Sequence, residues 1–397
     1  MSIDPKSINQ INIFKNDYPV GTLQRTKSGC QIEFSPEFKD AFSTLTFKIS
    51  TKEAIYKYKG AGLPPYFAGL LPEGLRLRSL IRKLKTSPDD LFSLLAATSG
   101  ETIGDIHFRT EVEATELEEI PNDFKLIRAQ LKKGIDPGGN ALAGIQDKIS
   151  ADRISLPLNL KKKNKSYILK LSSLEHPDII YNEHICLGIA RKCGLNVNKS
   201  NIVMDHKQQD ALLVERFDRL WDKDGKKWTR FHQEDACQIL DRYPGDKYLI
   251  PFQDIADEIG QLATSPEIEI LNLMKLKAFS YLIGNGDLHA KNISLTRKLD
   301  SDVVTLTPFY DIVCTAVYGD QKMALMMLGK NENLKRKTFV DFGKRYRIPD
   351  AAINSMLDKL TKQFFANYQK IFSVPVALKK RKFLESFFEE RLKHLEK

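Results

Sequence analysis

The segment "GNGDLHAKNISL", residues 284–295, places an acid, a histidine, a lysine and an amide within six positions. Asp287 and Asn292 lie five positions apart in it, with His289 and Lys291 between them. Folding alone has no use for such a cluster, because polar groups cost free energy to bury unless they are paired. A carboxylate can accept a proton, and carboxylate and amide oxygens can hold a divalent cation. The cluster therefore predicts a catalytic site.

The separation of acid and amide matches one kind of phosphoryl-transfer site. Protein kinases carry a loop H-R-D-x-x-x-x-N, whose Asp accepts the proton of the attacking hydroxyl and whose Asn helps to hold a metal ion. A separate Asp, after the next strands, holds the ions that bridge the phosphates. Here "NISLT" (292–296) and "VVTLT" (303–307) predict a hairpin that leads to Asp311 at a strand end. We therefore assign Asp287 as the base and Asn292 and Asp311 as metal ligands.

Two residues of this cluster have structural alternatives. Asp287 could be a turn residue, because Asn-Gly-Asp favours turns. The presence of Asn292 and Asp311 in the right order favours the catalytic interpretation. His289 has no second histidine nearby in sequence, so it could be a structural residue that helps to position Asp287.

A kinase also needs a strand lysine that grips phosphates and a helix acid that holds this lysine. "YILKLSS" supplies Lys170 on a predicted strand, and Glu183 follows on a predicted helix. A lysine in an apolar strand is costly unless it is paired, so we expect a partner; an edge-strand lysine that points to water is the alternative. The segment "ALLVERFDRL" could link two lobes, with the backbone around Glu215–Phe217 bonding an adenine edge.

A glycine-rich stretch, "DPGGNALAGIQDKIS" (136–150), precedes the strand of Lys170. Glycines let the backbone approach phosphate and point N–H groups at it. The stretch fits neither G-x-x-x-x-G-K-[ST] nor G-x-G-x-x-G, so it could also be an ordinary loop.

The elements that must position these residues fall into three predicted parts. Residues 1–108 read as mixed α and β, residues 109–220 as strand-rich with one marked helix, and residues 221–397 as mainly helical. We expect a strand–turn–strand that bends at Asn16-Asp17. We also expect a helix that begins near Pro72-Glu73.

Two further helices are predicted from their ends and periodicity. Ser87 is a plausible N-cap for the helix of "SPDDLFSLLAATSG". Residues 376–397 predict one amphipathic helix that packs on the body, with its basic run on a solvated face.

The bulk composition narrows the classes of partner and compartment. The 397 residues carry a formal net charge of +10, with 61 Lys and Arg spread along the chain. A phosphate-bearing ligand or an acidic protein explains this excess as well as DNA does. The five cysteines form no C-x-x-C pair, which is typical of a reducing cytoplasm. The polar N-terminus and the absence of a long apolar run predict neither a signal peptide nor a membrane span.

The quoted motifs together resemble one family. "AGIQDK", "ILKL", "LLVERFDRLW", "GNGDLHAKN" and "LTPFYDI" occur in the order found in the HipA family of bacterial Ser/Thr kinase toxins, and "FAGLLPEG" resembles its N-terminal subdomain. The resemblance covers nearly the whole chain. It implies an α+β, two-lobed protein-kinase-like fold with an extra N-terminal α/β subdomain and a mainly helical C-terminal lobe. ATP and Mg²⁺ are the implied cofactors.

The resemblance also implies roles for individual residues. Asp287 is similar to the family's base, Asn292 and Asp311 to its Mg²⁺ ligands, and Lys170 to its phosphate-gripping lysine. We place His289 with the catalytic residues. The nucleotide-binding residues implied in addition are Ala143, Gly144, Ile145, Gln146, Asp147 and Lys148 of the phosphate loop, Glu215, Phe217 and Lys291.

The resemblance also implies a substrate, because family members typically phosphorylate an aminoacyl-tRNA synthetase, which stalls translation and favours dormancy and persistence. Their antitoxin is a small helix-turn-helix protein of the HipB kind, through which the toxin reaches operator DNA. One departure concerns self-inhibition: the family's phosphate loop carries a serine that autophosphorylates, whereas Ala141 and Ala143 stand here. This control is then absent, or uses another residue such as Ser150, or has been removed by substitution.

Two other functions are compatible with the sequence. The chain could be a nucleotide-binding co-repressor that acts with a DNA-binding antitoxin without turning over ATP. It could also be a small-molecule kinase of related fold, although a small substrate needs no extra N-terminal surface.

Overall fold

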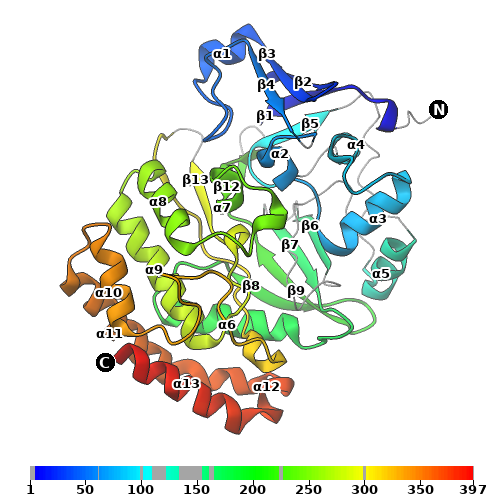
Figure 1. Cartoon of the computed structure of the whole chain (residues 1–397). Helices are drawn as coiled ribbons and strands as arrows, with labels where there is room; N and C mark the ends of the chain where they lie inside the picture. Colours follow the sequence, from blue (N-terminus) through cyan, green and yellow to red (C-terminus); the bar gives the residue numbers. More distant parts are fainter. Residues whose placement is uncertain are drawn as a thin grey trace.

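The computed structural model describes residues 5–60, 62–98, 102–109, 122–133, 154–160, 165–222, 227–297 and 301–396. Within these residues the chain forms four sheets. The sheets follow one another along the chain, and helices form most of the C-terminal part (Figure 1).

The first sheet lies at the top of Figure 1, and its five strands are antiparallel in the order β4-β3-β2-β1-β5. The strands are β1 (Gln10–Lys15), β2 (Tyr18–Thr26), β3 (Gly29–Phe34), β4 (Ile55–Lys59) and β5 (Ile106–Arg109). The predicted turn is confirmed, because Asn16 has a φ of +52° and β2 starts at Tyr18. Ile11 and Ile13 are buried on one face of β1, as the alternation of a strand requires. We call residues 5–109 the N-terminal domain.

In the described part of this domain, the sheet is accompanied by the helices α1 (Pro36–Ala41), α2 (Pro65–Gly69), α3 (Gly74–Leu84) and α4 (Leu91–Ala96). The helix predicted near Pro72-Glu73 is confirmed as α3. The predicted cap at Ser87 is wrong. The N–H of Asp90 donates to the Ser87 carbonyl in a turn, and Asp90 caps α4 by accepting from the N–H of Ser93. The helix therefore begins at Leu91, three residues later than a cap at Ser87 would place it.

The second sheet is antiparallel in the order β6-β7-β9-β8. Its strands are β6 (Ile154–Leu160), β7 (Lys165–Leu171), β8 (Ser200–Met204) and β9 (Asp210–Glu215). Helix α5 (Phe124–Lys132) covers one face and packs on Leu213, whereas α6 (Ile179–Lys192) covers the other and packs on Leu212. The predicted helix that carries Glu183 is confirmed as α6, and the chain turns out of it at Gly194, which has a φ of +78°.

The C-terminal lobe is built from a small sheet and a layer of helices. The sheet has the order β12-β13-β14 and follows a separate two-stranded ribbon of β10 and β11. These strands are β10 (Arg219–Asp222), β11 (Lys227–Arg230), β12 (His232–Asp235), β13 (Ser294–Arg297) and β14 (Val304–Leu306). The pairing of β13 with β14 confirms the predicted hairpin. The helices are α7 (Ala236–Ile239), α8 (Phe252–Leu262), α9 (Pro266–Ile283), α10 (Arg336–Lys344), α11 (Asp350–Asn367), α12 (Pro375–Lys379) and α13 (Arg381–Glu396).

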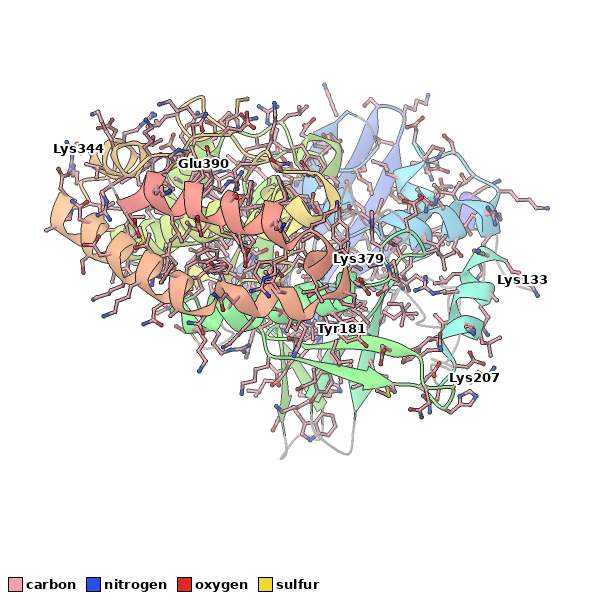
Figure 2. All side chains as sticks on the ribbon, turned by 90° about the horizontal axis from the view of Figure 1, so that it is seen from below. Lys133, Tyr181, Lys207, Lys344, Lys379 and Glu390 are labelled. Carbon is pink, nitrogen blue, oxygen red and sulfur yellow. The ribbon has the colours of Figure 1, made fainter. Side chains whose placement is uncertain are left out.

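The C-terminal segment differs from the single helix that its pattern predicts. It forms two helices, α12 and α13, because the chain leaves the helical conformation at Lys380. The run from Lys379 to Lys382 is exposed, as expected. Seen from below, α13 crosses the lobe with Glu390 at its surface (Figure 2). Among the helices of the described residues, none has both the length and the apolar character to cross a bilayer.

The central helix α9 buries a lysine that has consequences for stability. Lys277 is fully buried, its ammonium donates to the carbonyl of Leu325, and it lies 5.2 Å from the centre of the Phe252 ring. Burial, followed by the charge of Arg391, lowers the pKa of Lys277 to about 7. Burying this ammonium therefore opposes folding wherever it stays protonated.

We expect the free energy of unfolding to rise with pH because of Lys277. Between the folded pKa of about 7 and the ordinary lysine value, the unfolded chain binds more protons, so higher pH favours folding. The gain from pH 7 to pH 9 is about 2 kcal/mol. Urea titrations should show that the free energy of unfolding of the wild type rises by this amount from pH 7 to pH 9 relative to that of Lys277→Met. Lys362→Met, at an exposed lysine, is the control and should follow the wild type. If the wild type and Lys277→Met respond equally to pH, the lowered pKa of Lys277 is contradicted.

Candidate active site

The loop after α9 has a shape that its glycines permit. Helix α9 ends at Gly284, which has a φ of +74°. A Cβ on Gly286 would lie 2.6 Å from the carbonyl oxygen of Lys322, so a side chain is excluded there. The chain then turns through a 3-10 helix, η4 (Ala290–Asn292), which brings the Nδ2 of Asn292 to 3.1 Å from the Asp287 carbonyl. The acid and the amide at +5 are therefore neighbours, and both are buried.

A second group of charges lies under the β6-β7-β9-β8 sheet. Lys170 is 1% exposed on the inner strand β7, and its Nζ lies 2.8 Å from the Glu183 carboxylate on α6. It also contacts the Asp311 carboxylate. The expected partner is thus present, and the edge-strand alternative for Lys170 is wrong. Two buried carboxylates share one ammonium, which is the pairing that a buried lysine requires.

Asp311 lies off the strand end where the sequence places it. Strand β14 already ends at Leu306, and Asp311 adopts a left-handed conformation with a φ of +53° in the following loop. Its neighbour Tyr310 donates a hydrogen bond to the carbonyl of Lys291, at 2.9 Å. Since Asn292 follows Lys291 directly, this bond joins the two chain segments that carry the proposed metal ligands.

The donor set suits Mg²⁺. Among the described residues, the buried Oδ1 of Asn292 has no hydrogen-bond partner, so it can serve as a ligand. Mg²⁺ is usually held by one or two carboxylates together with substrate phosphates, rather than by a cage of protein groups. Asn292 and Asp311 provide such an incomplete oxygen set. The described residues contain no cluster of three or more His, Cys, Asp or Glu that could hold a metal ion.

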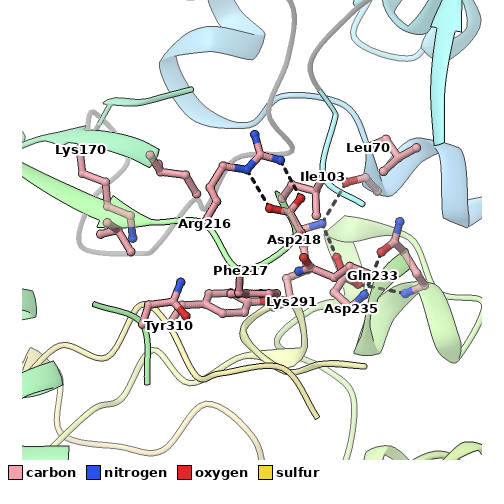
Figure 3. A pocket seen from close by; sticks show the side chains of 15 residues that line it. Leu70, Ile103, Lys170, Arg216, Phe217, Asp218, Gln233, Asp235, Lys291 and Tyr310 are labelled. Carbon is pink, nitrogen blue, oxygen red and sulfur yellow. Dashed lines mark hydrogen bonds and ion pairs between the residues drawn. The ribbon is translucent and has the colours of Figure 1, made fainter. Parts of the chain in front are cut away.

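A pocket opens where the N-terminal domain, the second sheet and the C-terminal lobe meet (Figure 3). Lys170 lies at one end, Lys291 and Asp235 at the other, and Phe217 and Tyr310 between them, with ring centroids 6.0 Å apart. The remaining lining residues are Gly69, Leu70, Ile103, Ile168, Asn198, Val214, Arg216, Asp218, Gln233 and Gln238. An apolar middle with charged ends suits a ligand that has a flat ring and an anionic tail.

Lys291 lies in the pocket wall as part of an ion cluster. Its Nζ is 2.8 Å from Asp235 and 3.5 Å from Glu73. Burial alone would lower the pKa of Lys291, but the carboxylates of Asp235 and Glu73 raise it above the ordinary value. Lys291 therefore stays protonated, and its charge is already balanced by protein groups.

The segment between the lobes has fewer free backbone groups for hydrogen bonds to an adenine edge than its sequence suggests. The N–H of Glu215 donates to the Lys199 carbonyl and its carbonyl accepts from Asn198, while its side chain pairs with Lys165. Phe217 alone of the predicted pair lines the pocket. Arg216 next to it is locked to Asp218, at 2.7 Å. Of the two residues predicted to contact adenine, only Phe217 therefore lies at the pocket, and the contact itself stays a prediction.

Other predicted residues fall into two groups. His289 is buried, and its ring meets that of Tyr248 edge-on, with centroids 5.1 Å apart, as a positioning residue would. The phosphate-loop residues Ala143, Gly144, Ile145, Gln146, Asp147 and Lys148, with Ala141 and Ser150, lie outside the described residues.

Tyr248, Tyr310 and Asp235 are functional residues of the site that were not predicted from the sequence. Tyr248 donates a hydrogen bond to Asp287, Tyr310 forms a wall of the pocket, and Asp235 pairs with Lys291. Tyr310 stands directly before Asp311 and could have been found from that position. Tyr248 and Asp235 have no local signal, because their partners are distant in sequence.

Comparison with known proteins assigns this chain to a family. Residues 140–368 match the model of the HipA-like C-terminal domain, and residues 11–109 match that of the HipA N-terminal domain. The chain belongs to the HipA family. Y4mE of Sinorhizobium fredii, which carries a provisional kinase name, is 28% identical to this HipA-family chain over 352 residues, 83% of each protein.

Two further matches come from Shewanella oneidensis. The serine/threonine-protein kinase toxin HipA is 26% identical over 289 residues, 66% of this chain and 65% of that protein. The solved complex of HipA, HipB and operator DNA contains a chain that matches with a TM-score of 0.71 at 21% identity, over 97% of this chain and 96% of that one. This likeness confirms the predicted α+β, kinase-like fold of the HipA family. The domain boundaries at 108/109 and 220/221 stay predictions.

Proposed function

We propose that this HipA-family protein is an ATP-dependent protein serine/threonine kinase that acts as the toxin of a toxin–antitoxin module. The observation that carries the proposal is the buried Lys170, which contacts a carboxylate from α6 and another from the loop of Asp311. A kinase requires the pairing of strand lysine and helix acid, together with a metal-holding acid. The kinase names of the relatives support the same activity.

Each residue then has a task in the transfer. Asp287 accepts the proton of the attacking hydroxyl, and Asn292 fixes the loop by donating to the Asp287 carbonyl at 3.1 Å. Lys170 grips the phosphates of ATP, and the rings of Phe217 and Tyr310 hold the base. Asn292 and Asp311 would hold Mg²⁺, which neutralises charge on the phosphates when bound.

The partners and the setting are also proposals. The HipA of the Shewanella oneidensis structure is bound to HipB and operator DNA, which supports a HipB-like helix-turn-helix antitoxin and contact with DNA through it. We propose an aminoacyl-tRNA synthetase as the protein substrate, with arrest of translation and persistence as the result. A cytoplasmic location agrees with the five buried free thiols.

A metal-ligand variant tests this function. In single-turnover assays with γ-labelled ATP, Mg²⁺ and a cell lysate, Asp311→Asn should reduce labelling by about 10²–10³-fold, the usual loss for one electrostatic group. Chelation of Mg²⁺ should abolish labelling in the wild type. Mass spectrometry of the lysate would identify the phosphorylated protein.

The control is Asp257→Asn, which alters an exposed carboxylate bonded only to Tyr346 among the contacts described for it. Labelling by Asp311→Asn at the wild-type rate would refute the assigned role. A wild type that binds ATP without transferring phosphate would instead favour the co-repressor, and labelling of a metabolite alone would favour the small-molecule kinase.

A further inference from the structure

A short segment, Tyr243–Tyr248, lies against the loop of the proposed base. The hydroxyl of Tyr248 donates to Oδ1 of Asp287 at 2.7 Å. The backbone N–H of Ala290 donates to the carbonyl of Lys247 at 3.0 Å. The segment therefore contacts both the carboxylate that would take the proton and the backbone that carries it.

The N-terminal domain holds the same segment from the other side. The carboxylate of Glu73 lies 2.8 Å from Nζ of Lys247, and both side chains are about nine-tenths buried. The hydroxyl of Tyr243 donates to the carbonyl of Leu63 at 2.7 Å, so it must accept from Tyr58 at 2.8 Å. A buried ion pair and two hydrogen bonds thus connect the N-terminal domain to this segment.

Glu73 also reaches the catalytic loop directly. Its second oxygen lies 3.5 Å from Nζ of Lys291, whose other partners are Asp235 and the carbonyl of Gly69 at 3.3 Å. One carboxylate of the N-terminal domain therefore faces two lysines, Lys247 of this segment and Lys291 of the loop itself. Removing that charge would leave two buried cations with one carboxylate between them, and such a cluster would rearrange.

We propose that Glu73 and Tyr248 are positioning residues through which the N-terminal domain sets the orientation of Asp287. The inference deepens the proposed function and rests on it, since it assigns no chemistry to either residue. Glu73 holds Lys247 and Lys291, and Tyr248 holds the carboxylate itself. A displacement of about 1 Å of a catalytic group can cost 10²-fold in rate, so loosening these contacts should slow transfer without emptying the nucleotide pocket.

Glu73→Gln and Tyr248→Phe provide the kinetic test. With ATP and Mg²⁺ as the probe, each variant should lower the kcat for release or transfer of the γ-phosphate by about 10–10²-fold. Affinity for MgATP, measured by calorimetry, should stay within about twofold of wild type in Tyr248→Phe, because Tyr248 does not line the pocket. The double variant should lose less than the product of the single losses, since the two residues act on one carboxylate.

The matched control is Glu258→Gln. Glu258 on α8 pairs with Lys48 of the N-terminal domain at 2.7 Å, so it joins the same two parts of the molecule away from the loop. Its kcat should remain that of the wild type. If Glu258→Gln slows turnover as much as Glu73→Gln does, domain docking in general explains the effect and the inference falls. The same holds if Tyr248→Phe keeps its full kcat.

Hydrogen exchange separates this inference from the proposed function. Amide exchange in residues 284–293 should be faster in Glu73→Gln and in Tyr248→Phe than in wild type, and unchanged in Glu258→Gln. This readout needs no turnover. A wild type without turnover would refute the proposed kinase, but hydrogen exchange would still decide whether Glu73 and Tyr248 hold the loop. Unchanged exchange in both variants would overturn the inference.

Discussion

Asp287→Asn is expected to slow phosphoryl transfer by about 10²–10⁴-fold and to leave nucleotide affinity unchanged. The asparagine has the same shape, and its oxygen can still accept the hydrogen bond that Tyr248 donates to Asp287 at 2.7 Å. What it loses is the ability to take the proton of the attacking hydroxyl. The backbone carbonyl that accepts from Asn292 is unaffected. The loss should therefore lie in kcat.

Single-turnover labelling and calorimetry with MgATP measure the two quantities separately. Asn285→Asp is not a suitable control, because Asn285 accepts from the Asp287 N–H. The exposed Asp257→Asn serves instead. Transfer by Asp287→Asn at the wild-type rate would remove Asp287 from the mechanism, and a large loss of affinity would show that its role is in binding.

Lys170→Met is expected to cost about 3–5 kcal/mol of stability as well as nucleotide affinity, because it removes the cation from a buried pair. Glu183 is fully buried and Asp311 nearly so, and both contact this ammonium. Without it, two carboxylates remain in a site of low polarity. Sequence reasoning alone assigns the lysine mainly to nucleotide binding; its burial adds the structural role.

Urea denaturation without nucleotide measures this cost, and the same strand offers a matched control. Lys165 pairs with Glu215 at 2.7 Å, but the two side chains are 42% and 29% exposed. Lys165→Met should therefore cost about 0–1 kcal/mol, the usual range for a surface pair. Adding Glu183→Met to Lys170→Met should recover part of the loss. Equal costs for Lys170→Met and Lys165→Met would contradict the structural role of Lys170.

Local patterns predicted most of the elements that carry the site. The pairing of Lys170 with Glu183 follows from a strand lysine and a helix acid whose elements are consecutive in the chain. The neighbouring placement of Asp287 and Asn292 follows from a turn of a few residues. One prediction failed where two local signals competed. Ser87 and Asp90 are both good caps, and the chain uses the first in a turn and the second at the helix.

By itself, the sequence determined the elements, the spacing of the acid and the amide, and the motifs that place the chain in the HipA family. The elements and the spacing depend on the conformational preferences and periodicity of residues that are close together in the chain, so a short segment is enough to predict them. Only the tertiary structure decided that Glu73 faces Lys247 and Lys291, that Tyr248 donates to Asp287, and that Lys291 is already paired. A charge or a hydroxyl does not specify its partner, and partners far apart along the chain meet only when separate cores pack together.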